Sequence, residues 1–527
     1  MQQCSQWTAY LRRPYQRFSS TQYYMHNITC RYSTKNQKKY TFPITTIKSL
    51  VTDSTYIGKT VTVHGWVRSQ RLQKTVTFID LDDGSLLSGL QIVMDSSVAK
   101  TLTTGTSVKI SGKLVPSPSK NQAVDLEAID LTVLGECDSQ SYAISKNRLP
   151  LEHLREYQHL RSRTRIFGAL WRIRSAALQG IHDFFRAQEF TQVNMPILTT
   201  HDCEGGGEAF RVLTDDTLKS YQNYAVNYSQ TTQHQALPLP DEFFGKPVYT
   251  TVSAQLHLEF MASALSRVYV LGPAFRAEKS QSTRHLAEFW MLEAEACFIP
   301  TISALTDLIE GNIKHVIQHV LNTCQEDLAL FDQFSERDLV QKLDNVSNKL
   351  FERMTYTDAV QVLLNAEKSI NGKRCAPEWQ FPVKWGLPLQ SEHEKFLAET
   401  IIKGPVFVTD YPKKIKPFYM KQSGIGNTSV TKCDGETVAC TDLLLPKVGE
   451  LAGGSLREDQ YELLAQKIND AGLDSAQLEW YLDLRKYGSV PHGGYGMGFE
   501  RLLGYLTGMT NIRDMIPAPR SYGHCKF

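Results

Sequence analysis

Alternating apolar and polar positions dominate the chain between Gly58 and Cys137. Five such runs predict short β-strands, at 61–67, 76–80, 90–94, 107–111 and 128–134. Turn-forming residues at 82–84 and 116–118 separate the second run from the third and the fourth from the fifth. Five strands in so short a segment predict a small β-barrel, for which the five-stranded OB-fold is the leading candidate. SH3-like barrels and sandwich fragments share the strand count and stay open as alternatives.

A helical periodicity begins after a polar stretch at 138–160, which suits a hinge. Six apolar residues spaced three or four apart lie on one face of a predicted helix: Ile166, Leu170, Ile173, Ala177, Ile181 and Phe184. The chain then becomes extended up to Pro196. Further helices are predicted at 301–323, 335–350 and 456–471, the last with Ser455 and Glu458 at capping-box spacing and Gly472 at its end.

Strands mixed with helices in this way predict an α+β domain with a largely antiparallel sheet flanked by helices. The predicted organisation is a leader at 1–40, a barrel at 41–137, a hinge at 138–160 and a second domain at 161–527. The glutamine-rich stretch at 214–240 predicts a surface insertion within about 211–242.

Charge is distributed unevenly, although the net charge is only +2. Residues 1–52 contain eight lysines and arginines and no carboxylate, since the first acid is Asp53. Such a segment is typical of a mitochondrial transit peptide, with a cut near Arg31 to Ser33, and a basic arm that touches nucleic acid is the alternative.

Cysteine spacing and the length of the apolar runs exclude some classes of protein. The ten cysteines include no CxxC pair, which argues against a zinc site and a disulfide framework. Because no run of about 18 apolar residues occurs, a membrane span is not expected.

Two segments contain candidate chemistry. The first, between β-like runs at 268–271 and 289–298, presents Arg276, Arg284 and His285 on a loop, where guanidinium groups could meet a polyphosphate. Surface pairing of these arginines with Glu278 and Glu288 is the alternative. The second, 491–501, is rich in glycine, is predicted to follow a strand and opens a helix with Arg501, whose guanidinium could stack on a heterocycle.

These two segments, together with the helix before Pro196, resemble the motifs of a known protein family. In chain order, the helix ending at Pro196, the segment 275–289 and the segment 496–501 resemble the three signature motifs of class II aminoacyl-tRNA synthetases. An N-terminal OB-fold is typical of the subgroup for aspartate, asparagine and lysine. Finer matches resemble the asparagine enzymes of the bacterial and organellar type, at 204–206, 253–259, 284–293, 449–457 and 516–520. The resemblance covers about residues 55–527.

The resemblance implies activation of an amino acid by ATP and its transfer to tRNA. It implies that Arg276 holds the α-phosphate, that Arg284 and His285 meet the β- and γ-phosphates, and that Arg501 stacks on adenine, with Arg276 and Arg501 as the catalytic pair. Glu450 would hold Mg²⁺, which prefers carboxylate and phosphate oxygens. Further ATP-binding positions implied by the resemblance are Glu278, Leu286, Gly498 and Glu500. A purely structural imidazole is the alternative for His285.

For the amino acid, the resemblance places Glu204 and Gln255 around the α-amino group and Arg457 at the side-chain oxygen. Similar aspartate enzymes carry lysine where this chain has Leu258 and an amide where it has Glu259. Loss of a cation and gain of an acceptor favour the amide of asparagine. The alternative for Glu259 is a charge at a helix N-terminus.

In the barrel, the resemblance implies that Phe78 stacks on an anticodon base and that Arg68 and Arg71 meet phosphates. A buried core phenylalanine is the alternative for Phe78.

The resulting hypothesis is ATP-dependent attachment of L-asparagine to tRNA(Asn) in the mitochondrial matrix. The partners are tRNA(Asn), asparagine and ATP, without membrane insertion. The helix 166–184 and the strand to Pro196 resemble the motif that forms the family's subunit interface, and this resemblance implies a homodimer. Alternatives are an aspartyl-tRNA synthetase, possibly charging both tRNAs, a silent RNA-binding paralogue that would not need Arg276, Glu450 and Arg501, and a tRNA-independent asparagine synthetase, which would lack the barrel.

Overall fold

The computed structural model describes residues 44–97, 102–119, 122–145, 149–200, 209–230, 242–367, 378–423 and 436–527, without the side chains of 224–230. The predicted leader at 1–40 and Glu204 lie outside these described residues.

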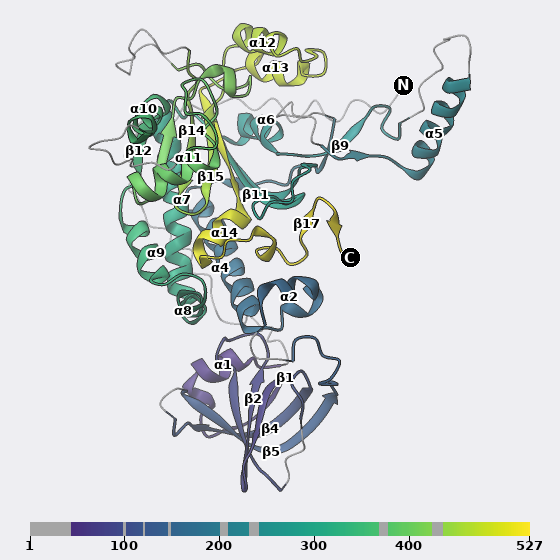
Figure 1. Ribbon diagram of the computed structural model, residues 1–527, viewed down its shortest axis with the longest axis vertical. Helices are drawn as coiled ribbons and strands as arrows, with labels where there is room; N and C mark the ends of the chain where they lie inside the picture. Colours follow the sequence, from purple (N-terminus) through teal and green to yellow (C-terminus); the bar gives the residue numbers. More distant parts are fainter. Residues whose placement is uncertain are drawn as a thin grey trace, which may run out of the picture. The chain divides into compact units, whose positions relative to one another are not determined.

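A closed five-stranded barrel forms the N-terminal part of the described chain (Figure 1). Its strands follow the order β1-β2-β3-β5-β4 and span Thr60–Leu72, Val76–Asp82, Leu90–Asp95, Ser107–Pro116 and Val124–Gly135 for β1 to β5. Inward-facing residues such as Val63, Ile79 and Ile110 are wholly buried, and α1 (Ile47–Thr52) adds Ile47 and Leu50 to this core. The predicted barrel is confirmed, with each of the five predicted strands present and longer than predicted.

A second, larger sheet forms the centre of the rest of the chain. Its strands run in the order β12-β13-β14-β15-β16-β11-β10-β6, with the short β17 paired to β11 and β18 paired to β17. In that order they span Glu352–Thr355, Val406–Thr409, Cys440–Leu445, Gly449–Leu456, His492–Gly498, Glu288–Cys297, Arg267–Phe275 and Thr191–Gln192, with β17 at Arg520–Ser521 and β18 at His524–Cys525. Only the pairs β10–β6 and β12–β13 are parallel among the described strands of this sheet, so the predicted antiparallel character is confirmed.

Helices supply the apolar layer against this sheet. The helix α4 (Arg165–Ala187) packs with α7 (Ile302–Thr323), and α8 (Gln325–Phe334), α9 (Leu339–Asn348) and α14 (Phe499–Thr507) lie in the same cluster (Figure 1). The apolar face predicted for 166–184 is therefore real, but it is covered by α7 of the same chain. That apolar face is not available to a partner subunit.

Two predicted helix boundaries were wrong. Ser455 is not a helix cap, because it lies in β15 opposite Gly494 of β16, and the helix α12 begins only at Tyr461 and runs to Asp470. Glu458 is buried and accepts a hydrogen bond from Lys467 Nζ at 2.6 Å. The predicted helix at 335–350 is the shorter α9, whereas the predicted helix end at Gly472, which has a φ of +68°, is confirmed.

The remaining elements surround the sheet. Two short helices, α2 (Leu151–Glu156) and α3 (Gln158–Arg161), follow the barrel, and α5 (Asp215–Gln230) lies in the predicted insertion. A small sheet has the order β7-β9-β8, at Leu198–Thr199, Val248–Thr250 and Arg211–Val212. The other helices are α6 (Gln255–Leu265), α10 (Tyr356–Glu367), α11 (Ser391–Phe396) and α13 (Glu479–Lys486).

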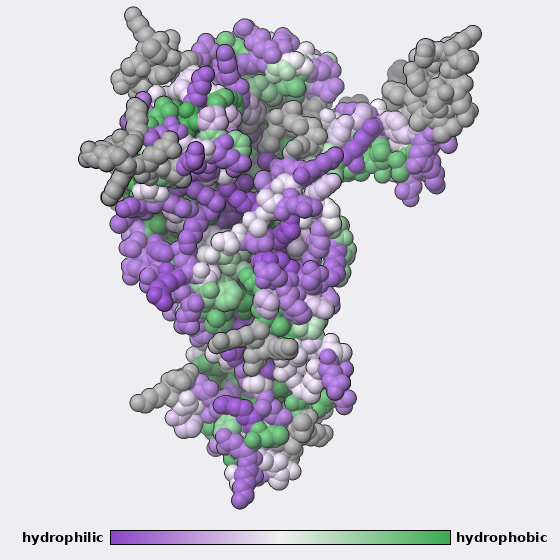
Figure 2. All heavy atoms as spheres, in the orientation of Figure 1, coloured by the Kyte–Doolittle hydropathy of each residue, from purple (hydrophilic) through white to green (hydrophobic). Residues whose placement is uncertain are grey.

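The surface is mainly hydrophilic in the view of Figure 2. Within the described residues, none of the helices is both long enough and apolar enough to cross a membrane.

Candidate active site

A cavity of about 360 Å³ opens at the centre of the large sheet. It is lined from the loop between β10 and β11, from the middle strands and from the start of α14. It brings together eleven residues implied by the resemblance: Gln255, Arg276, Glu278, Arg284, His285, Leu286, Glu450, Arg457, Gly498, Glu500 and Arg501. Residues that lie more than 200 positions apart in sequence therefore share one site.

The loop 276–287 joins two paired antiparallel strands, since Phe275 of β10 lies opposite Glu288 of β11. The Arg284 guanidinium donates a hydrogen bond to the carbonyl oxygen of Val448, so it lies against the cavity wall and not in a surface pair with Glu288. Burial and the nearby charge of Arg501 lower the pKa of Arg284. The Arg276 guanidinium lies 5.7 Å from the ring centroid of Phe289.

His285 remains accessible on this loop. Its Nε2 atom lies 3.4 Å from Glu278 Oε2, its Nδ1 atom lies 3.1 Å from the Ser280 hydroxyl, and its side chain is 42% exposed. A buried structural imidazole is therefore excluded for His285.

The glycine-rich segment near the C-terminus is itself a strand, β16, and does not follow one. It approaches β11 so closely that a Cβ atom on Gly494 would lie 1.9 Å from Glu295 Oε2 and 2.3 Å from the Ala294 carbonyl oxygen. Only glycine fits at such a distance. At the end of this strand the chain turns into α14, which places Arg501 at the cavity.

Arg501 and Glu450 are in direct contact in the cavity wall. Arg501 Nη1 donates to the Glu450 carbonyl oxygen at 2.7 Å and lies 3.8 Å from its carboxylate. The Glu450 side chain is 43% exposed, so its carboxylate can take a further ligand. The neighbouring Glu500 differs, since its two oxygens accept from Arg174 Nη1 and the Trp290 backbone N–H, both at 2.9 Å. Glu500 thus fixes the start of α14.

The inner end of the cavity is a buried ionic network around Arg457. Arg457 Nη2 donates to Glu295 Oε2 at 2.9 Å, and Nη1 donates to the Ser455 hydroxyl at 2.9 Å. Arg457 Nε lies 3.8 Å from Glu259 Oε1. Because Glu295 and Ser455 hold the guanidinium, its direction toward the cavity is set before any substrate binds.

Glu259 lies within α6, one turn beyond its first residue, and is 2% exposed. Its Oε2 atom accepts hydrogen bonds from Arg485 Nη2 and the Tyr481 hydroxyl, both at 2.7 Å. Burial alone would raise the pKa of Glu259, but the charge of Arg485 and the contact with His492 outweigh burial and hold this pKa well below its usual value. Glu259 is therefore a compensated internal anion and not a charge at a helix end.

Besides Glu295, sequence reasoning missed Asp442 and Lys416, which line the cavity, and Glu394, which contacts Glu450. Asp442 of β14 lines the cavity and accepts from Lys416 Nζ at 2.7 and 3.0 Å. Glu394 of α11 accepts from the Glu450 backbone N–H at 3.2 Å, and burial with the charge of Glu450 raises its pKa to about 7. A single acid inside the apolar strand 440–445 is the signal that could have identified Asp442.

The barrel residues behave differently from one another. The Arg71 guanidinium lies 5.6 Å from the ring centroid of the half-buried Phe78, which is its partner across β1 and β2. Arg68 instead donates to Asp82 at 2.7 Å and to the Arg163 carbonyl oxygen. Arg71 and Phe78 thus lie together on the barrel, whereas Arg68 is engaged within the chain.

Family comparisons agree with this geometry. The family model described as tRNA synthetases class II (D, K and N) matches residues 151–522, and the model of the OB-fold nucleic acid binding domain matches residues 61–134. The chain therefore belongs to the class II tRNA synthetases of the aspartate, lysine and asparagine group.

Individual relatives show to which amino acid group within this class the chain belongs. An asparagine–tRNA ligase of Microcystis aeruginosa is 44% identical over 469 residues, which cover 88% of this chain and 95% of that protein. The chloroplastic/mitochondrial asparagine–tRNA ligase of Arabidopsis thaliana is 43% identical over 481 residues, covering 89% and 81%. Within the class, the chain belongs to the asparagine–tRNA ligase family.

Solved structures show the same architecture. The asparaginyl-tRNA synthetase of Pyrococcus horikoshii complexed with asparaginyl-adenylate has a TM-score of 0.74 and 28% identity, covering 92% of this chain and 99% of that one. An aspartyl-tRNA synthetase of Entamoeba histolytica, at 18% identity and a TM-score of 0.65, shares the fold alone.

Proposed function

We propose that this chain attaches L-asparagine to tRNA(Asn) by way of an asparaginyl-adenylate, for translation in mitochondria. The observation that carries the proposal is the one cavity that Arg276, Arg284, Arg501 and Glu450 line together, with Arg457 at its inner end. Cations suited to ATP and a guanidinium suited to an amino acid side chain thus share one small volume.

In the first step, a carboxylate oxygen of asparagine attacks the α-phosphorus of ATP, and the bond to the β-phosphate breaks to release pyrophosphate. The nucleophile is already an anion, so alignment and charge neutralisation supply most of the rate. Arg276 would meet the α-phosphate and Arg284 the departing phosphates. Adenine would lie between Phe289 and the Arg501 guanidinium, since both line the cavity.

In the second step, a ribose hydroxyl at the 3′ end of tRNA attacks the carbonyl carbon of the adenylate, and AMP leaves. The barrel would hold the anticodon through Phe78 and Arg71. The exposed Arg71 guanidinium beside the half-buried Phe78 ring suits an unpaired base and its phosphate.

Magnesium fits the donors present. Glu450 and Asp442 both line the cavity, and Mg²⁺ binds through one or two carboxylates together with substrate phosphates. Glu450, with its exposed carboxylate, would be the principal ligand, and Asp442 would join it after release from Lys416. The ion would neutralise phosphate charge, while Arg276, Arg284 and Arg501 orient the triphosphate.

Asparagine is favoured over aspartate by the charge balance of the inner site. Arg457 is already neutralised by Glu295 at 2.9 Å, and the nearby Leu258 supplies no second cation. A second carboxylate brought against this pair would lack a counter-charge, whereas an amide needs none. Glu259 would offer its Oε1 atom as the acceptor for the amide of asparagine. This atom lies 3.3 Å from Gln255 Nε2 and 3.8 Å from Arg457 Nε.

A homodimer and a mitochondrial location belong to the same proposal. Apolar side chains on and beside the small sheet β7-β9-β8 are 37% to 43% exposed, namely Ile197, Leu198, Phe210 and Val212, and a two-fold partner would cover them. The organellar relative in Arabidopsis and the acid-free, basic residues 1–52 support import. Sedimentation of the purified chain tests the dimer, and a fluorescent fusion of residues 1–52 tests import.

The decisive test is ATP–pyrophosphate exchange with asparagine and aspartate side by side. Asparagine should support exchange and aspartate should not, and Arg276→Ala should reduce exchange by at least about a hundredfold, the scale for loss of a preorganised charge. The control is Lys413→Met, which removes a surface cation paired with Glu436 and should leave exchange unchanged. Exchange with aspartate alone would favour the aspartyl alternative.

A further inference from the structure

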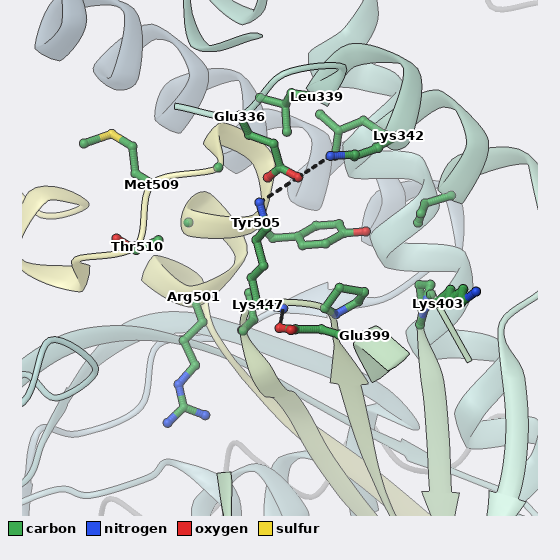
Figure 3. A pocket seen from close by; sticks show the side chains of 18 of the residues that line it. Glu336, Leu339, Lys342, Glu399, Lys403, Lys447, Arg501, Tyr505, Met509 and Thr510 are labelled. Carbon is green, nitrogen blue, oxygen red and sulfur yellow. Dashed lines mark hydrogen bonds and ion pairs between the residues drawn. The ribbon is translucent and has the colours of Figure 1, made fainter. Parts of the chain in front are cut away.

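A second cavity of about 800 Å³ adjoins the first. Its walls come from α9, the segment 349–352, the segment 399–405, the turn 446–448 between β14 and β15, and α14 (Figure 3). Of the described residues, four line both cavities: Arg284, Glu500, Arg501 and Ile512. The volume is that of a small-molecule site, and the proposed reaction places no substrate in it.

The wall of this cavity combines an apolar lining with excess positive charge. Buried Leu339, Leu343, Phe351 and Met509 face it, together with the ring of Tyr505. Six cationic side chains and four carboxylates line it, and one of those carboxylates, Glu500, is already bound to Arg174 outside the cavity. An anion with an apolar body matches this lining.

The excess positive charge is greatest around Lys342 and Lys447. Lys342 Nζ and Lys447 Nζ lie 2.7 and 2.9 Å from the same Glu336 oxygen, so two ammonium groups share one carboxylate. Figure 3 shows Glu336 and Lys342 on one side of the Tyr505 ring and Glu399 on the other. Lys403, farther along the wall, has no carboxylate partner in the described part of the chain.

The turn 446–448 connects this cavity to the site for ATP. On one side Lys447 pairs with Glu336, and its backbone N–H donates to Glu399 Oε1 at 2.6 Å. On the other side the Val448 carbonyl oxygen accepts from Arg284. A molecule that draws Lys447 toward itself therefore shifts the support of an arginine implied in phosphate binding.

We propose that the second cavity binds a small organic anion with a flat apolar body, and that its occupancy weakens ATP binding. The negative group lies between Lys342 and Lys447, and the apolar body lies against Tyr505 and Leu343. The binding of the anion is argued from the cavity alone, and its effect on ATP binding rests on the proposed function. By thermodynamic linkage, ATP must weaken the anion by the same factor as the anion weakens ATP.

The binding test uses the aromatic sulfonate 1-anilinonaphthalene-8-sulfonate and the full chain, followed by fluorescence. Saturable binding at one site per chain is expected. In Lys342→Met/Lys447→Met the Glu336 carboxylate is left without either cation, and the dissociation constant should rise at least about tenfold, or about 1.4 kcal/mol. Lys342→Arg/Lys447→Arg retains the charge and should bind as the wild type does. Lys413→Met, whose ammonium lines neither cavity, should also bind normally.

A second variant keeps the test independent of the ion pairs. Gly404 lines the cavity, and a Cβ atom built on it meets no atom within 4 Å, so Gly404→Phe adds bulk without a clash at its base. It should reduce the number of bound dye molecules. Dye binding that is equal in the wild type, in the double Met variant and in Gly404→Phe would overturn the site.

Equilibrium dialysis with labelled ATP tests the coupling. Saturating dye should raise the ATP dissociation constant by about threefold or more, within the usual range of coupling between sites, and ATP should raise that of the dye equally. The double Met variant should lose this coupling. Dye that binds without altering ATP would refute the effect on ATP binding alone, whereas a chain that binds dye but no ATP would contradict the proposed function and leave the site standing.

Discussion

Glu259 Oε2 lies 2.7 Å from Arg485 Nη2, and neither side chain is exposed. Removal of one member leaves an uncompensated charge inside the protein, which typically costs about 3–5 kcal/mol. Arg485→Met should therefore lower the urea midpoint strongly and impair asparagine activation. Glu259→Gln combined with Arg485→Met removes both charges and should regain part of the stability. An unchanged midpoint in the single variant would show that this ion pair does not stabilise the fold.

A second cation near Arg457 should admit aspartate. Leu258 is 1% exposed and lines the cavity next to the Arg457 network. Leu258→Lys places an ammonium beside the position of the second carboxylate oxygen of aspartate. The ratio of kcat/KM for aspartate to that for asparagine should therefore rise at least about tenfold, equivalent to about 1.4 kcal/mol. Leu258→Met, which conserves volume without charge, should leave the ratio near that of the wild type. A ratio that responds equally to both changes would point to packing and not charge.

Asp514 should position the ATP-binding loop. It is fully buried and accepts from Arg155 Nη2 at 2.7 Å, while the N–H of Ile512, two residues earlier, donates to the Thr283 carbonyl oxygen at 2.9 Å. Asp514→Asn weakens the hold on this segment and should raise the KM for ATP more than it changes kcat. Glu152→Gln is the matched control, since Glu152 contacts Arg155 only at the exposed surface. Equal effects of the two variants would remove Asp514 from this role.

His393 should make stability fall in acid. It is 1% exposed, its Nδ1 accepts from the Gln390 N–H at 3.1 Å, and its Nε2 lies 3.2 Å from the Phe381 carbonyl oxygen, so the ring fits as the neutral Nε2–H form. Burial lowers the pKa of His393 below its ordinary value.

The sign follows from linkage, because the unfolded chain binds the proton more readily than the folded one. The contribution of His393 is complete above about pH 6.5 and is lost as the pH falls through the lower folded pKa. Urea unfolding of the wild type and His393→Gln, measured across this range, should show a shallower loss in the variant. Parallel curves would assign the acid sensitivity to other groups.

Phe78 should matter for tRNA and not for adenylate formation. Phe78→Ala removes the ring beneath Arg71 and should weaken tRNA aminoacylation by about 1–3 kcal/mol, the range for one base stacked on an aromatic ring. ATP–pyrophosphate exchange without tRNA should be unchanged. Phe78→Trp should retain aminoacylation, and a loss of exchange in Phe78→Ala would indicate a folding defect instead.

Sequence patterns succeeded where they reflect local chemistry. The period of two in 61–134 and the period of 3.6 in 166–184 each report one buried face, and the structure has strands and a helix at those places. The prediction of the helix start at Ser455 was wrong because strand pairing with Gly494 outweighed a local capping pattern. Tertiary pairing of this kind leaves no trace in a short window.

Some residues of the candidate site could be predicted from the sequence, and others could not. Arg276, Arg284 and Arg501 stand in recognisable segments, so their assembly into one cavity could be anticipated from the resemblance. The partner of Glu259 could not be anticipated, because Arg485 lies more than 200 residues later in a helix without a distinctive pattern. Which charges compensate one another inside a protein depends on contacts that only the folded chain defines.

The glycines of β16 have a genetic consequence. Every missense change at a glycine codon adds a side chain, and at Gly494 even a methyl group would meet Glu295, the residue that holds Arg457. Such a change disturbs the central sheet and the amino acid pocket together. In a population, codon 494 should therefore tolerate synonymous change only, and a missense allele there should behave as a loss of function.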